Sequence, residues 1–417
     1  MWEEIPEILD DFMDEEVETL KNIKARYEKN IARKDVEKGG EMERASLTDL
    51  PEGIIFDILV KVPPGDVYKN GRLVCRAWRE IISRDDFVAQ NFIESKGGLL
   101  VGGPTSHKNQ YFEVKLMEIE GTQLDYKLLD FGLCRMGCAR SSCNGLLLVN
   151  HPKQKGLLQV MNLITTVGLT LPKCPSGCPH KACGSALGFD PNKKEYKVVH
   201  MYADAFGFEI FNLGCPDATW KRIPGPWNGL QERPFNFENF SWSDPVSVNG
   251  RVLHWYVASD KYIISMDVSE EISIKTYLPY TGEEIEKDRY TLVELGGDLS
   301  FVYSLSDIQV DVWTLDDFRE QIWSKRHSIQ LELINYMMPE NLLQSTKYTI
   351  ALPNLSKLVT VASEGADILI LKHDNSCLYM YDMRHRVLKK FKMNMKSPMR
   401  FIPHRSSLLH WKTLKDS

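Results

Sequence analysis

The spacing of hydrophobic residues changes twice along the chain and divides it into three regions. In residues 1–38, apolar side chains recur every three or four positions, which predicts one amphipathic helix. Its first half is acidic and basic residues follow, an order that favours a helix through its macrodipole. This helix is expected to lie on the body or pair with its own copy, or alternatively to dock on a partner. Gly39-Gly40 interrupts the pattern, so residues 39–45 are predicted to form a linker.

Short helices are predicted over residues 46–95. Apolar residues at helical spacing define a first helix that opens at Pro51, and Pro63-Pro64-Gly65 is expected to end it. Asp66 is then the expected cap of the next helix.

A second apolar stripe covers residues 73–82 at the same helical spacing. Asn70-Gly71, just before it, has low helix propensity and is expected to disturb the helix. Some fifty residues of short helices cannot bury so many large side chains alone, so part of their surface is predicted to contact a partner.

The spacing becomes that of β-strands at residue 98 and remains so to residue 405. Short apolar runs are bounded there by Gly, Asn and Pro. The runs cover residues 99–101, 111–114, 146–149, 196–199, 208–211, 252–256, 263–267, 301–303, 310–313, 368–371 and 378–381.

A glycine turn followed by a hydrophobic strand recurs along this region. The turns are Asn144-Gly145, Asn249-Gly250, Gly296-Gly297 and Glu364-Gly365. Spacings of roughly 45–60 residues suit four-stranded propeller blades. The predicted fold is an α+β multidomain protein: an N-terminal helix, a small all-α domain, an all-β propeller-like body of five to six degenerate blades over residues 98–405, and a tail at 406–417.

Composition and charge restrict the partners. Hydrophobic residues make up 43% and charged residues 26% of the chain, as in ordinary globular proteins. The net charge of −6 is concentrated in residues 1–45, and without a basic face we expect no nucleic-acid partner. The acidic start differs from a signal peptide, and no apolar run reaches the roughly 20 residues that cross a bilayer. We therefore expect no membrane partner, reduced cysteines, and a location in the cytoplasm, the nucleus or both.

Zinc-type ligands gather in one short segment. They are Cys174, Cys178, His180 and Cys183, and the gaps between Cys134, Cys138 and Cys143 repeat part of their spacing. Neither group has the common pairing of two C-x2-C motifs, so the sequence favours loop and core thiols over a bound metal. The four residues remain a weak candidate for a structural or redox-sensing zinc site.

Aromatic residues are concentrated between residues 223 and 245, together with prolines and glycines. A long loop of this composition can present binding anchors, because Trp and Tyr dominate interface hot spots. The candidates for substrate binding are Trp227, Phe235, Phe237, Phe240 and Trp242. The alternative is that these rings fold back into the core.

Catalytic sequence motifs are absent. The chain has no GxGxxG loop after a strand, no Walker P-loop, no HExxH and no GxSxG. We therefore expect no catalytic residue and no cofactor, and a propeller enzyme with a site in the central channel is disfavoured.

Two stretches resemble a known family. Residues 47–78, from Leu-Thr-Asp-Leu-Pro-Glu to Val-Cys-Arg-Ala-Trp, resemble an F-box, with one residue more than usual in the segment 68–72. Ser-Cys-Asn-Gly-Leu-Leu at 142–147, Leu-Gly-Phe-Asp-Pro at 187–191 and Val-Asn-Gly-Arg-Val-Leu-His-Trp at 248–255 are similar to the F-box-associated domain of plant F-box proteins, whose body is kelch- or propeller-like. Together the two resemblances cover about residues 46–400.

The resemblance implies a role and a partner. F-box side chains pack against a Skp1-type adaptor, which links the protein to cullin and RING subunits. The matching positions here are Leu50, Pro51, Ile54, Ile58, Leu59, Leu73, Val74 and Trp78. Some of these must instead form the core of the small domain.

The implied function is that of a non-catalytic substrate-recognition subunit of an SCF-type (Skp1-cullin-F-box) E3 ubiquitin ligase, with a protein substrate on the propeller. The alternative is a propeller scaffold that binds protein or glycan and whose degenerate F-box has no ligase role.

Overall fold

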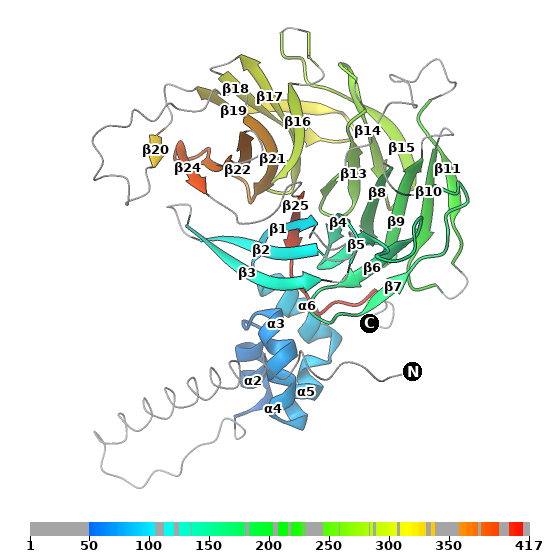
Figure 1. Cartoon of the computed structure of the whole chain (residues 1–417), viewed down its shortest axis with the longest axis vertical. Helices are drawn as coiled ribbons and strands as arrows, with labels where there is room; N and C mark the ends of the chain where they lie inside the picture. The colour runs from blue at the N-terminus through cyan, green and yellow to red at the C-terminus, as the bar shows by residue number, and fades with distance from the viewer. Residues whose placement is uncertain are drawn as a thin grey trace. The chain divides into compact units, whose positions relative to one another are not determined.

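The computed structural model describes residues 50–411, except 105–111, 121–124, 135, 179, 181–182, 203–206, 216–217, 228, 230–244, 258, 283, 287–288, 307–308, 331–334, 338–357, 374–376 and 392–399. Helices occupy the first part of this range and strands the rest (Figure 1). The predicted helix of residues 1–38, the linker at 39–45 and the end of the tail lie outside the described residues. Within the described residues, no helix is long and apolar enough to cross a membrane.

Short helical segments follow one another from residue 52 to residue 94. They are α2 (Glu52–Leu59), α3 (Pro64–Asp66), η2 (Val67–Gly71), α4 (Arg72–Val74), α5 (Arg76–Ile82) and α6 (Asp85–Glu94). Pro64 is the first residue of α3, where its missing N–H leaves no intrahelical bond unmade. Pro63 precedes α3, and Asp66 lies at the N-cap position of η2. Asp66 has helical backbone angles (φ −71°, ψ −40°) and makes no side-chain capping hydrogen bond, so the predicted cap is not formed.

The segment Val67–Gly71, which contains Asn70-Gly71, forms a π-helical turn, η2. The N–H of Arg72 donates to the carbonyl of Val67, a bond that encloses one residue more than an α-helical bond does. Gly71 keeps right-handed helical angles, and the helical path ends only at Cys75, which is extended (φ −158°, ψ 172°). The expected disturbance at Asn70-Gly71 is therefore a local widening of the helix, not a break.

The strands of the described residues form six sheets, each built on four antiparallel strands, and in five of them these four strands are neighbours in sequence order. Five sheets consist of β4 (Ala139–Cys143), β5 (Leu146–Asn150), β6 (Leu158–Asn162) and β7 (Gly168–Thr170); β8 (Gly184–Asp190), β9 (Glu195–Tyr202), β10 (Gly207–Asn212) and β11 (Lys221–Pro224); β12 (Val246–Val248), β13 (Val252–Trp255), β14 (Tyr262–Asp267) and β15 (Ile272–Tyr277); β16 (Tyr290–Leu295), β17 (Asp298–Ser306), β18 (Gln309–Asp317) and β19 (Ile322–Gln330); and β21 (Leu358–Glu364), β22 (Ile368–His373), β23 (Cys377–Asp382) and β24 (Val387–Phe391), beside which β20 (Asn335–Met337) runs parallel.

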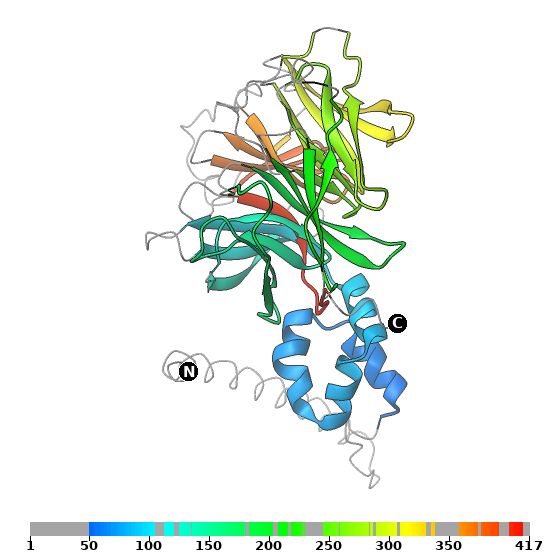
Figure 2. The ribbon, with the colours of Figure 1, turned by 90° about the vertical axis from the view of Figure 1, so that its right-hand side faces the viewer.

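The sixth sheet joins the two ends of the strand region. Its order is β25 (Arg400–Arg405), β1 (Gly97–Pro104), β2 (Phe112–Glu120) and β3 (Asp125–Cys134). β25 pairs with β1 from Gly97↔Arg405 to Gly102↔Arg400, so the last strand completes the first blade. The sheets follow one another around a common axis (Figure 1, Figure 2). The body is a six-bladed β-propeller, which confirms the predicted propeller fold of five to six blades, and closure into a ring protects its strand edges.

Turns of one type repeat from blade to blade. The side chain that ends the third strand accepts a hydrogen bond from the backbone two or three residues on, which forms an Asx turn. The four pairs are Asn162 with Ile164 N, Asp267 with Ser269 N, Asp317 with Arg319 N, and Asp382 with His385 N, each at 2.8 Å.

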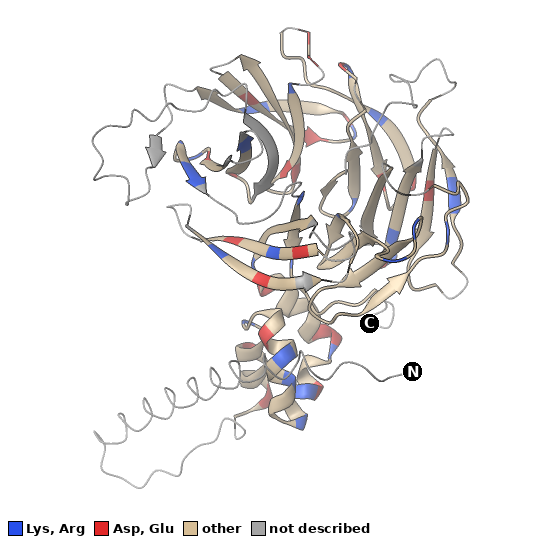
Figure 3. Ribbon diagram, viewed as in Figure 1, with Lys and Arg blue, Asp and Glu red and all other residues tan. Residues whose placement is uncertain are grey.

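The apolar core lies between the faces of neighbouring blades. One cluster joins Phe208 and Ile210 of β10 to Trp255 of β13, and the rings of Phe208 and Trp255 are 5.3 Å apart. Lys and Arg residues alternate with Asp and Glu residues over the described strands, without a region of one charge there (Figure 3).

Two histidines are buried as neutral groups, and we predict that they make stability depend on pH. Burial lowers the pKa of His254 to about 3 and that of His404 to about 4. In the unfolded chain both titrate near 6.5, so the unfolded state binds more protons as the pH falls from about 6.5 towards 4. The protein is therefore most stable above about pH 6.5 and loses stability as the pH falls towards 4. At pH 5, protonation of each histidine in the unfolded state should lower the free energy of unfolding by about 2 kcal/mol relative to its value above pH 7.

Urea unfolding at pH 7 and pH 5 measures this effect. The double variant His254→Gln/His404→Gln should lose less stability than the wild type over the same pH interval. An equal loss in the two proteins would contradict the prediction.

Candidate functional site

The helix α2 has one buried and one exposed apolar side. Ile55 and Leu59 are buried, with 6% and 3% of their surface exposed, whereas Ile54 and Ile58 are 47% and 46% exposed. Ile54 and Ile58 lie one turn apart and therefore share a face of the helix. Leu59, one of the predicted Skp1 contacts, is part of the core of this domain.

The end of α4 carries a second pair of exposed apolar residues. Leu73 is 66% and Val74 is 56% exposed, just before the break at Cys75. Trp78 on α5 is partly buried, and its indole nitrogen has no hydrogen-bond partner among the described residues. A partner that covers this segment would bury the two aliphatic side chains.

The structure thus sorts the predicted Skp1-binding residues into three groups. Leu59 is buried and Leu50 and Trp78 are partly buried. The exposed residues are Pro51, Ile54, Ile58, Leu73 and Val74. The partner contact itself stays a prediction.

One of the five candidate substrate-binding aromatics lies among the described residues. Trp227 is 8% exposed and packs in the same core cluster as Trp255. Its indole nitrogen donates to the hydroxyl of Tyr262 at 3.2 Å. Trp227 is therefore mostly a packing residue, whereas Phe235, Phe237, Phe240 and Trp242 lie outside the described residues.

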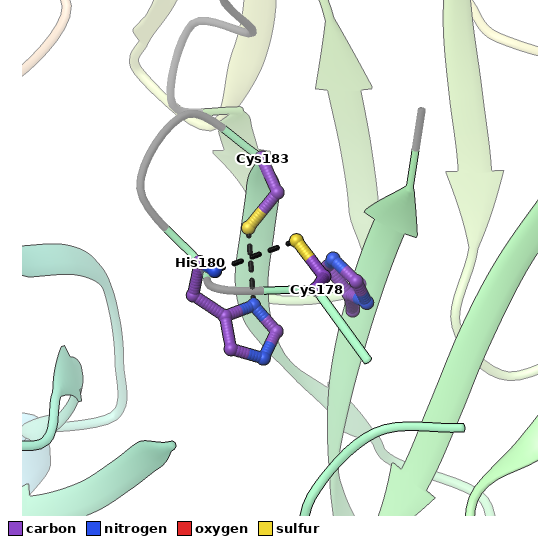
Figure 4. A group of neighbouring side chains, drawn as sticks. Cys178, His180 and Cys183 are labelled. Carbon is purple, nitrogen blue, oxygen red and sulfur yellow. Dashed lines mark hydrogen bonds between the residues drawn. The ribbon is translucent and has the colours of Figure 1, made fainter. Parts of the chain in front are cut away.

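The cysteines of the sequence motif meet two histidines in space. The connection from β7 to β8 supplies four side chains and β9 supplies the fifth. We call this set the thiol–imidazole cluster, and its members are Cys174, Cys178, His180, Cys183 and His200. Figure 4 shows Cys178, His180 and Cys183 turned towards one another. By contrast, Cys143 of the upstream cysteines is buried in an apolar core.

The distances inside the cluster are short. Nδ1 of His180 is 3.1 Å from Sγ of Cys183, and Nε2 of the same ring is 3.5 Å from Sγ of Cys174. The backbone N–H of His180 donates to Sγ of Cys178 at 3.4 Å. The rings of His180 and His200 are edge to face, with centroids 4.5 Å apart.

A buried carboxylate holds His200. Glu209 on β10 is the direct cross-strand partner of His200, and its Oε2 lies 3.0 Å from Nδ1 of the imidazole. Both side chains are fully buried. The backbone N–H and the hydroxyl of Ser176 also donate to Glu209, each at 2.8 Å. The connection from β7 to β8 is therefore attached to the blade through the same carboxylate.

The cluster is electrostatically unusual for thiols. The neighbouring Cys178 thiol is the main cause that lowers the pKa of Cys183 to about 4, against the effect of burial, and the pKa of Cys178 rises in return. Burial raises the pKa of Cys174, but hydrogen bonds with His180 and His200 outweigh it and lower the value to about 6. Burial lowers the pKa of His200, but the thiols and Glu209 raise it well above 6.5. The site therefore favours thiolates beside imidazolium groups.

Sequence analysis missed His200 and Glu209. Each stands between apolar neighbours in its strand, Val-Val-His-Met in β9 and Gly-Phe-Glu-Ile-Phe in β10. A buried polar residue needs a partner, which was the available signal. The register of β9 against β10, which places His200 opposite Glu209, could not be predicted from the sequence alone.

Comparison with known proteins identifies the family of the body. The model of the F-box associated beta propeller domain family matches residues 105–411. An F-box protein of Arabidopsis thaliana is 27% identical over 311 residues, which cover 69% of this chain and 81% of the plant protein. A putative F-box protein of the same plant is 23% identical over 297 residues, which cover 68% and 71%.

Among solved structures, a chain in the crystal structure of a nidogen/laminin complex aligns with 75% of this chain and 99% of its own length. The identity is 8% and the TM-score is 0.42. The family match, in contrast, covers most of the chain and agrees with the six-bladed fold. The protein therefore belongs to the F-box associated β-propeller family.

Proposed function

We propose that this protein is the substrate-recognition subunit of an SCF-type E3 ubiquitin ligase. In this role the helical segment binds a Skp1-type adaptor and, through it, the cullin and RING subunits, and the propeller binds a protein substrate. The observation that carries the proposal is the exposure of Ile58, Leu73 and Val74 in a short helical segment that precedes an F-box-associated propeller.

Exposed apolar residues of this size favour an interface. Burial of a Leu, Val or Ile side chain contributes roughly 1.5–3 kcal/mol relative to full exposure. The buried apolar residues of the helical segment, such as Ile55 and Leu59, pack in its core. The exposed apolar residues can therefore contact a partner without loss of that core. The π-helical turn does not interrupt the helical segment that carries the exposed Leu73 and Val74. The helical backbone continues to Val74 and ends at Cys75.

The proposed role needs no catalytic group on this chain. An adaptor raises the effective concentration of substrate lysines beside a charged ubiquitin-conjugating enzyme. Protein substrate and adaptor would then occupy different parts of the chain.

The test is a single charge on the exposed helical surface. We predict that Leu73→Asp binds a purified Skp1-type adaptor about 100-fold more weakly than the wild type, because an unpaired carboxylate in an apolar interface costs several kcal/mol. Biolayer interferometry with the full-length chain measures the affinity. Leu73 is 66% exposed, so the melting temperature of the free chain should stay close to that of the wild type.

A matched control separates the interface from general surface effects. Ile272 on β15 is 52% exposed, and Ile272→Asp should bind the adaptor as the wild type does. Equal weakening in both variants would count against a specific helical contact. A folded wild-type chain that does not bind the adaptor at all would favour the scaffold with a degenerate F-box.

A further inference from the structure

We propose that the thiol–imidazole cluster binds one Zn²⁺ ion. The ligands are Cys178, His180, Cys183 and His200, with one atom from each. We assign Nδ1 to His180, because it faces Sγ of Cys183, and Nε2 to His200, because Glu209 holds its Nδ1. This set keeps three residues of the sequence motif and replaces Cys174 with His200, which comes from the neighbouring strand.

The spacing of the ligand atoms is close to that of a zinc tetrahedron. One ligand atom from each of the four residues lies within 4.8 Å of the others. Zn–S bonds of about 2.3 Å and Zn–N bonds of about 2.1 Å give a tetrahedron with N···S edges of about 3.6 Å. Nδ1 of His180 and Sγ of Cys183 are already 3.1 Å apart. Movement of about 1 Å or less by the side chains would complete the geometry.

The second nitrogen of each imidazole has the partner that a zinc-bound histidine requires. A metal-bound histidine donates its other N–H to an acceptor, which fixes the tautomer and the ring orientation. For His200 the acceptor is the buried carboxylate of Glu209, 3.0 Å from Nδ1. For His180 it is the sulfur of Cys174, 3.5 Å from Nε2. Cys174 therefore supports a ligand and is not one itself.

Buried polar contacts hold the ligand segment before any metal is bound. Arg140 of β4 donates to the carbonyl oxygens of His180 and Cys183, the second at 3.4 Å. The side-chain amide of Asn150 also donates to the His180 carbonyl, at 3.1 Å. His180 has a positive φ of 51°, and these contacts offset the cost of that conformation.

The ligand set indicates zinc in a structural role. Two thiolates and two imidazoles in a tetrahedron are typical of Zn²⁺, and two thiolates neutralise its charge. Four protein ligands leave no open coordination position for a substrate. The ion would tie the connection between two neighbouring blades to β9, and Cys178, which is partly exposed, gives the ion a path from solvent.

Zinc analysis of the full-length chain tests the proposal. The wild type, purified without chelator from zinc-supplemented cells, should contain about one zinc per chain by mass spectrometry. Cys183→Ser and His200→Asn should each contain less than about a tenth of that amount. The wild type loaded with Co²⁺ should show a sulfur-to-cobalt charge-transfer band that Cys183→Ser lacks.

Two further variants keep the outcome informative if the ligand variants fold poorly. Cys138→Ser, a partly exposed cysteine outside the cluster, and Cys174→Ser should both retain zinc. A folded wild-type chain without zinc, or zinc retained in Cys183→Ser, would overturn the proposal. Loss of zinc in Cys174→Ser with retention in His200→Asn would overturn the ligand assignment. None of these results depends on adaptor binding.

Discussion

A chain that ends at residue 398 is expected to fail to form the propeller. It lacks β25, which supplies the backbone partners of β1 from Gly97 to Gly102. It also lacks Leu409 and Trp411, which are 5% and 6% exposed. Loss of a buried Leu costs about 2–5 kcal/mol and loss of a buried Trp about 3–5 kcal/mol, and together these approach the whole stability of a domain, about 5–15 kcal/mol.

Two hydrogen bonds add to this loss. The side-chain amide of Asn162 donates to the carbonyls of Ser407 and Leu409 at 2.9 and 3.1 Å, and both acceptors would be missing. Near-UV circular dichroism and thermal unfolding of the purified chains measure the outcome. A chain that ends at residue 411 should unfold cooperatively like the full length. Cooperative unfolding of the shorter chain at a similar temperature would refute the role of β25.

The substitution Lys197→Met is expected to lower the free energy of unfolding by about 3–5 kcal/mol. Lys197 is fully buried, with its ammonium 3.3 Å from Asp190 and 2.9 Å from Glu271. It also donates to the carbonyl of Val268 at 2.9 Å, so it links two blades. Without the cation, the fully buried Asp190 carboxylate faces an apolar side chain.

Urea unfolding at pH 7 measures this loss, and the neighbouring lysine is the control. Lys221 also contacts Glu271, at 2.6 Å, but is 67% exposed, so Lys221→Met should cost less than about 1 kcal/mol. The double variant Lys197→Met/Asp190→Asn should recover part of the lost stability, because no unpaired buried charge remains at Asp190. Equal effects of Lys197→Met and Lys221→Met would contradict the assignment.

The blades could be predicted because each strand and turn is encoded by residues that are neighbours in the sequence. The apolar runs at residues 196–199 and 263–267 lie within β9 and β14, and Asn249-Gly250 forms the turn between β12 and β13, where both residues have positive φ. The pairing of β25 with β1 depends on ring closure between distant residues, which no local pattern encodes. The π-helical turn was hidden because low helix propensity at Asn70-Gly71 predicts a break equally well.

The sites were predicted only in part, for physical reasons. Ile58 and Leu59 are both apolar and adjacent, so the periodicity marks both and only packing shows that Leu59 is buried and Ile58 exposed. Cys178, His180 and Cys183 of the thiol–imidazole cluster are close in sequence, so their spacing marked them as a weak zinc candidate. His200 was not marked, because its place depends on the register of β9 against β10.

The closure of the first blade by the last strand also has a consequence for synthesis. β1 ends at Pro104 and β25 begins at Arg400, so nearly the whole body is translated between the two halves of one sheet. At typical elongation rates this interval lasts on the order of tens of seconds. During that time one edge of β1 lacks its partner strand, and an unpaired strand edge can pair with another chain. Only chains translated to the end of β25 can close the ring, so the fold itself distinguishes finished from interrupted products.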